Sequence, residues 1–116
     1  MPPAARIEHE SIPVGTLDML VLKTLLASRR ELHGFEIAEA IQRASRDVLR
    51  VEEGSLYPAL QRMLVRNWLV GEWGRTADNR RARYYRATAA GKRQLDREIA
   101  SYRRVSEAIG LILQPA

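Results

Sequence analysis

The chain of 116 residues contains no cysteine, and this absence removes several kinds of functional site at once. Disulfide bonds, thiolate metal centres and thiol nucleophiles are all excluded. The two histidines, His9 and His33, are separated by a predicted helix and have no nucleophile beside them, so the sequence offers neither a catalytic triad nor zinc-ligand spacing. It also lacks a glycine-rich phosphate loop. We therefore expect a protein that is not an enzyme and that needs no cofactor or metal.

Long apolar runs are also missing. Even the most apolar stretch, residues 19–26, contains Lys23 and Thr24, and the first ten residues lack the apolar centre of a signal peptide. We therefore expect a cytoplasmic protein with no membrane partner. The length is sufficient for one compact domain with one appended element.

Positive charge is concentrated at one end of a chain whose net charge is +5. Residues 1–74 carry nine Lys and Arg against ten Asp and Glu, whereas residues 75–116 carry ten against four. All the excess positive charge therefore lies in the C-terminal third. A basic surface of this kind suits nucleic acid, although a merely solvated surface would have the same composition.

The first half of the chain has the periodicity of helices. Residues 1–14 have no such period and hold three of the five prolines, so we expect a flexible arm there. A first helix is predicted from Thr16, as its N-cap, to about Ser28. Its apolar residues surround nearly the whole helix, which implies burial on more than one side. Gly34 opens a second helix, whose predicted packing face is Phe35, Ile37, Ala38 and Ile41.

A third helix is predicted after a short β-prone segment at residues 48–51. Ser55 is its expected N-cap, Pro58 its third residue and Asn67 its left-handed cap. The buried face follows helical spacing and consists of Leu56, Leu60, Met63 and Leu64.

Two strands and a long helix complete the chain. Residues 69–73 and 83–87 are predicted strands joined by a polar, arginine-rich loop at residues 74–82. Thr88 then caps a helix that reaches about Leu113, which would be about 39 Å long. The expected fold is mainly α with a small β-hairpin, in which residues 15–87 form one domain and residues 88–113 a helix that extends beyond it.

Three helices followed by a hairpin is the order of a winged helix-turn-helix, whose third helix enters the major groove while the wing contacts nearby backbone. On the third helix, Tyr57 and Arg62 can reach phosphates or base edges, and Gln61 can read adenine. In the wing, Arg80 and Arg81 are the expected phosphate contacts, with Arg75 behind them. The predicted DNA-binding residues are Ser55, Tyr57, Gln61, Arg62, Arg75, Arg80 and Arg81.

The aromatic residues near the wing have two interpretations. At least one of Tyr84 and Tyr85 is expected in the core, and Trp68 and Trp73 are expected to fill the core or a dimer interface. Alternatively, Trp68 and Trp73 could line a site for an unknown small-molecule effector next to the first helix.

The last helix carries an apolar stripe close to coiled-coil spacing, with Ser106 in one position of the seam. A projecting apolar stripe is costly to leave in water, so we expect it to pair with a second copy and with the first helix. A two-fold dimer would present two recognition helices to a site with dyad symmetry. The predicted interface residues are Leu20, Leu95, Ile99, Tyr102, Ile109 and Leu113.

Five segments follow one another along residues 14–105, in the order GTLDMLVLKTL, LHGFEIAEAI, EEGSLYPALQRM, NWLVGEW and NRRARYYRATAAGKRQL. In these segments and their order the chain resembles the PadR family of bacterial transcriptional regulators. The resemblance implies a winged-helix repressor that is dimerised through its C-terminal region and binds dyad promoter sites. It also implies that Tyr57, Arg80 and Arg81 lie at the DNA.

The chain departs from the family pattern in two respects. A single helix follows the wing, as in the short subfamily, so an effector pocket of longer members does not carry over. Asn67 stands where glycine is common, which the cap conformation permits. The sequence therefore predicts a regulator that binds double-stranded DNA; the alternative is a winged-helix module that binds protein only.

Overall fold

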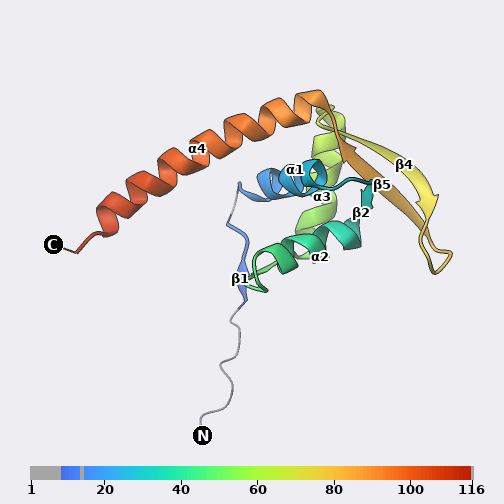
Figure 1. Cartoon of the computed structure of the whole chain (residues 1–116), viewed down its shortest axis with the longest axis horizontal. Helices are drawn as coiled ribbons and strands as arrows, with labels where there is room; N and C mark the ends of the chain where they lie inside the picture. Colours follow the sequence, from blue (N-terminus) through green and yellow to red (C-terminus); the bar gives the residue numbers. More distant parts are fainter. Residues whose placement is uncertain (1–8, 14, 116) are drawn as a thin grey trace, which may run out of the picture.

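The computed structural model of the chain describes residues 9–13 and 15–115. In this part of the chain, four helices and two small sheets form the fold (Figure 1). The last helix, α4 (Ala89–Leu113), and the hairpin of β4 (Leu69–Arg75) and β5 (Arg81–Ala87) project from opposite sides of the helical body. The predicted fold class, mainly α with a small β-hairpin in winged-helix order, is confirmed.

The core is built around α1 (Leu17–Ala27), which packs against α2 (Gly34–Ala44), α3 (Glu53–Val65) and α4. This central position explains why α1 is apolar on nearly all sides, because its second side is covered by α4 of the same chain. The largest of the fully buried side chains are Val21, Leu22, Ile37, Leu56, Leu60, Met63 and Leu69.

The hairpin belongs to a three-stranded antiparallel sheet. Its order is β2 (Leu32–His33), β5, β4, and the hairpin register runs from Leu69 opposite Ala87 to Arg75 opposite Arg81. Two further strands, β1 (Glu10–Ser11) and β3 (Leu49–Arg50), pair in parallel. The sequence indicated β3, within residues 48–51, but neither β1 nor β2. The rest of the predicted N-terminal arm, residues 1–8 and 14, lies outside the described residues.

One predicted helix cap is correct in position only, and another is wrong. Thr16 occupies the predicted N-cap position of α1, but its hydroxyl donates to the carbonyl oxygen of Pro13 at 2.8 Å and makes no capping hydrogen bond to the helix. Helix α3 begins at Glu53, with Glu52 in the N-cap position, so Ser55 lies inside the first turn and Pro58 is its sixth residue. Gly54 and Ser55 predict a later start, but Glu53 is already helical and Glu52, with extended backbone, is the N-cap residue.

The predicted wing loop is longer than the observed one. The strands continue to Arg75 and from Arg81, and the turn between them closes through a hydrogen bond from the Thr76 amide to the Arg80 carbonyl at 2.8 Å. Inside this hydrogen bond the loop has three residues, 77–79, and Asn79 has φ of 62°, the left-handed conformation that is common at the end of such loops.

One predicted core residue lies outside the core. Phe35, predicted on the packing face of α2, lies in the first turn of this helix and is 66% exposed.

The corner where α3 ends and α4 begins confirms two other predictions. Asn67 has φ of 61° and closes α3 through the paired hydrogen bonds of a Schellman motif, Trp68 N to Met63 O at 2.9 Å and Asn67 N to Leu64 O at 3.0 Å. The Thr88 hydroxyl oxygen accepts from the amide of Gly91 at 3.0 Å and so caps α4. The same hydroxyl donates to the Asn67 carbonyl at 2.7 Å, which fastens α4 to the end of α3.

Candidate nucleic-acid interface

The four residues of α3 that were predicted to bind DNA are all exposed, but the structure divides them between two sides of the helix. Tyr57 and Gln61 line a crevice of about 300 Å³ between α3 and the wing. Ser55 and Arg62 line a separate hollow, together with the segment that follows β1. The predicted set is therefore not one continuous surface.

Tyr57 lies at the boundary between α2 and α3, where Gly34 leaves room for its ring because it has no side chain. A Cβ atom at Gly34 would lie 3.2 Å from the Tyr57 hydroxyl oxygen and 3.3 Å from its ring carbons. The ring therefore packs closely over the start of α2, while half of the residue remains exposed. A hydroxyl group in this position can donate a hydrogen bond to a phosphate oxygen or a base edge.

Arg62 has a nearby carboxylate that the sequence did not reveal. Its guanidinium lies 3.4 Å from a carboxylate oxygen of Asp18, in the first turn of α1. The Arg62 side chain remains half exposed, but its charge is shared with this partner. It is therefore less available to a phosphate than an unpaired arginine would be.

The three wing arginines predicted at the DNA have different positions. Arg75 donates to the carbonyl oxygen of Asn79 at 3.2 Å and so braces the turn. Arg80 is exposed in the turn itself. Arg81 is the first residue of β5 and lines the crevice beside Tyr57 and Gln61. The structure thus brings Arg81 to α3.

The structure adds two crevice residues that sequence reasoning missed, Trp73 and Arg83. Trp73 was expected to fill the core or a dimer interface, but it is 60% exposed on the wing. The Arg81 guanidinium lies over its ring, 4.4 Å from the ring centre. Strand alternation could have grouped Trp73 with Arg83 once the position of the turn was known, because the two residues are directly opposite each other.

Ion pairing and capping fix the start of α2 beside the wing. The Glu36 carboxylate accepts from the His33 amide at 3.1 Å and from the Arg30 guanidinium at 2.6 Å. The hydrogen bond from Arg30 is the main reason why the pKa of Glu36 lies below its ordinary value. Burial of the carboxyl group raises this pKa, and the hydrogen bond from the His33 amide lowers it. The His33 ring meets Tyr84 of β5 edge-on at 5.4 Å. Helix α2 is thus attached to the sheet.

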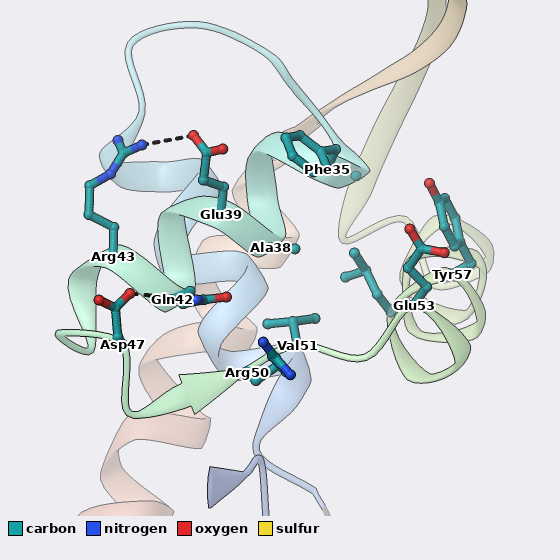
Figure 2. Close-up of a pocket in the computed structure, with 12 residues that line it drawn as sticks. Phe35, Ala38, Glu39, Gln42, Arg43, Asp47, Arg50, Val51, Glu53 and Tyr57 are labelled. Atoms are coloured by element: carbon teal, nitrogen blue, oxygen red, sulfur yellow. Dashed lines mark hydrogen bonds and ion pairs between the residues drawn. The ribbon is translucent and has the colours of Figure 1, made fainter. Parts of the chain in front are cut away.

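A second groove, of about 560 Å³, lies on the other side of Tyr57, between α2 and the start of α3 (Figure 2). Its charges are mixed. Glu39 pairs with Arg43 at 2.8 Å, and the Asp47 carboxylate accepts from Gln42 at 3.5 Å. The Glu53 carboxylate also lines the groove, close to Tyr57. A groove that carries three carboxylates has no preference for a polyanion.

The predicted dimer residues also divide into two groups. Leu95 is only 4% exposed and belongs to the core of its own chain, so its assignment to the dimer seam is wrong. Leu20 and Ile99 are partly buried against the same core. Tyr102 and Ile109 are half exposed and Leu113 more so, on a part of α4 where every residue from 100 to 115 is exposed.

One acidic residue lies at the inner end of this exposed part of α4. The pKa of Glu98 is raised, chiefly because the carboxyl group is partly buried and also because Asp18 lies nearby. Its Oε1 accepts from Gln94 at 3.2 Å, whereas Oε2 has no hydrogen-bond partner among the described residues.

Residues 9–13 and 15–115 contain no cluster of three or more acidic or histidine side chains that could hold a metal ion. None of their helices combines the length and the apolar character needed to cross a membrane.

Comparison with known proteins identifies the family. The model of the transcriptional regulator PadR-like family matches residues 21–97. Transcriptional regulator Rv3488 of Mycobacterium tuberculosis is 44% identical over 69 residues, which are 60% of this chain and 61% of that protein. A PadR-like transcriptional regulator from Bacillus cereus is 27% identical with a TM-score of 0.68, over 88% of this chain and 95% of that one. Bacillus subtilis PadR, solved in complex with operator DNA, has the same fold at 18% identity and a TM-score of 0.63, over 76% of this chain and 48% of that one. The chain belongs to the PadR-like family of transcriptional regulators.

Proposed function

We propose that this regulator is a homodimeric repressor that binds a dyad-symmetric promoter site in the cytoplasm through α3 and the wing. The observation that carries the proposal is the composition of the crevice between these elements. Arg81 and Arg83 lie there beside the exposed Tyr57 and Gln61, and none of the described residues that line it carries a carboxylate. Guanidinium groups bind phosphates, while hydroxyl and amide groups bind phosphates or base edges.

The fold comparison supports the same interpretation. Bacillus subtilis PadR, which shares this fold, was solved in complex with operator DNA. Proteins of this family are transcriptional regulators and not enzymes. Repression is the role that the family resemblance implies, and we adopt it here.

The dimer is proposed from the outer half of α4. Beyond Ile99 this helix exposes apolar side chains that include Tyr102, Val105, Ile109 and Ile112. Such a concentration of apolar surface on one helix is costly in water and marks an interaction site. Pairing with a second copy would cover it and would place two recognition helices on one duplex.

A small-molecule effector stays a prediction, but the structure separates the two tryptophans that were expected to bind it. Trp68 packs against the core where α3 meets β4, with the Arg66 guanidinium 5.1 Å from its ring centre. Trp73 lies five residues further along, in β4, which is about 16 Å of extended chain. The two rings of one protomer therefore do not line a common site.

Binding to DNA from the protein's own promoter region, measured by gel shift from about 50 to about 200 mM salt, tests the function. We expect selective binding that weakens by orders of magnitude, because several phosphate contacts are lost to salt. Tyr57→Ala and Arg81→Ala should weaken binding, whereas Lys92→Ala, an exposed residue of α4, should not. Absence of selective binding at every salt concentration would favour a module that binds only protein.

Sedimentation tests the dimer separately. Ile109→Glu places a charge on the exposed apolar side of α4, and we expect it to yield a monomer that binds the promoter weakly. The matched control is Arg104→Glu, because residue 104 lies about 140° around the helix from Ile109. A dimer that survives Ile109→Glu would contradict the proposed interface. Ile99→Glu is a poorer test, since Ile99 also packs against its own core.

A further inference from the structure

The inner face of the wing changes its chemistry halfway along the hairpin. Directly opposite residues of an antiparallel pair lie on the same face, so Leu69, Gly71 and Trp73 share a face with their partners on β5. At the base of the hairpin this face is core, because Leu69 and Tyr85 are almost completely buried. Towards the tip it continues as the exposed Trp73 with Arg75, Arg81 and Arg83.

Trp73 is the centre of this outer part. The guanidinium of Arg81 lies 4.4 Å from the centre of its ring, and that of Arg83 lies 5.8 Å away. Both distances are within the range of cation–π attraction. An arginine that stacks on an aromatic face keeps its N–H groups at the rim of the guanidinium plane, where they remain free to donate.

Gly71 provides the space in which Arg83 lies. A Cβ atom at Gly71 would be 2.6 Å from Nε of Arg83, closer than real Cβ contacts. The Arg83 side chain therefore crosses the backbone of β4, and its Nε is buried with no hydrogen-bond partner among the described residues. The absence of a side chain at Gly71 thus allows Arg83 to lie close against β4.

The crevice differs in charge from the groove on the other side of Tyr57. Among the described residues that line the crevice, the arginines Arg81 and Arg83 carry its charge, and Tyr57 and Gln61 form the opposite wall. The groove in Figure 2 combines Arg43 and Arg50 with three carboxylates. An anion is therefore attracted to the wing side of Tyr57.

We propose that Trp73 is the positioning residue of this interface: its indole holds Arg81 and Arg83 against the crevice, where the two arginines bind a phosphate of the DNA backbone. The inference rests on the proposed DNA-binding function. A free arginine side chain loses part of its rotamer entropy when it binds. Stacking on the indole restricts both arginines before the phosphate arrives, so less entropy is lost on binding.

The test is a double-mutant cycle read by the anisotropy of labelled promoter DNA at several salt concentrations. Arg81→Ala should weaken binding and lower the slope of log affinity against log salt by about one. Trp73→Ala, which removes no charge, should weaken binding about 3- to 30-fold and also lower the slope, because the released arginines no longer meet the phosphate. The double variant should lose less than the sum of the two single losses.

Two further variants make the result specific. Trp73→Phe keeps a ring for the arginines and should retain most of the affinity, whereas Val70→Ala, on the opposite face of β4, should behave as wild type. Circular dichroism of each variant shows that the wing domain is folded. Additive losses, an unchanged salt slope in Trp73→Ala, or equal losses in the alanine and phenylalanine variants would overturn the inference. Failure of the wild-type protein to bind promoter DNA would instead overturn the proposed function.

Discussion

The first turn of α4 packs so closely on the end of α3 that a single added methyl group should destabilise the protein. A Cβ atom at Gly91 would lie 2.3 Å from the carbonyl oxygen of Trp68 and 3.1 Å from Cδ2 of Leu22. The Trp68 carbonyl cannot easily retreat, since it accepts the amide of Thr88 at 3.0 Å. Gly91→Ala therefore forces backbone to move at the joint between the two helices.

Two opposing contributions set the magnitude. Alanine has a higher helix propensity than glycine, which is worth up to about 1 kcal/mol. Overpacking a close-packed site costs typically about 1–3 kcal/mol, and a clash with backbone belongs in the upper half of this range. We expect a net loss of about 1–2 kcal/mol in the free energy of unfolding, or a fall in Tm of roughly 4 °C or more for a domain of this size.

Thermal unfolding followed by circular dichroism at a fixed protein concentration measures this loss, because the Tm of an oligomer depends on concentration. Gly110→Ala is the matched control in the same helix. A Cβ atom there meets nothing within 4 Å, so this variant should be as stable as wild type or more so. If Gly91→Ala melts at or above the wild-type temperature, the close packing inferred at this joint is refuted.

Four further tests follow from individual residues. Asn67→Ala should lower the free energy of unfolding by about 1 kcal/mol and Asn67→Gly should not, because φ is 61°; equal losses in a urea titration would contradict this. Thr88→Ala should cost about 1 kcal/mol in the same titration, while Thr88→Ser keeps most of the cap; similar losses in both would argue against a capping role. For the pair of Arg30 and Glu36, the folded-state pKa of the glutamate lies below its unfolded value, so the stabilisation is present above the unfolded pKa and is lost as pH falls through the folded pKa. Wild type should thus lose more stability in acid than Arg30→Ala, and parallel pH curves would contradict the assignment. The opposite sign applies to Glu98, whose raised pKa makes ionisation unfavourable in the folded state; Glu98→Gln should be more stable than wild type at pH 7, with a difference that disappears in acid, and a constant difference would refute this.

The parts of the fold that could be predicted from sequence depend on local chemistry. Asn67 is one of the few residue types that adopt the left-handed conformation readily, and Thr88 is a favoured N-cap. The caps at both ends of the joint between α3 and α4 could therefore be predicted from the few residues around each of them. The order of helices and strands followed in the same way, from a change in apolar period.

The parts of the fold that could not be predicted depend on which other element each residue packs against. Strands of two residues, such as β1 and β2, have no period to recognise. An apolar stripe on a helix shows which side avoids water but not what covers it, so Leu95 could not be told apart from Ile109. The candidate site shows the same limit, because Trp73 joins the arginines only through a register that is set by the exact position of the turn.

The register of the wing also limits where residues can be inserted into the hairpin or deleted from it. One strand pair supplies both the buried Leu69 and Tyr85 and the exposed Trp73 with its arginines, all on one face. Insertion of one residue within either strand would turn every side chain beyond it to the other face of the sheet. Length variation that preserves both the core and the crevice is therefore confined to the turn at residues 76–80. In homologues or in engineered variants, a wing of different length should differ there, and the spacing between its buried end and its tryptophan should stay even.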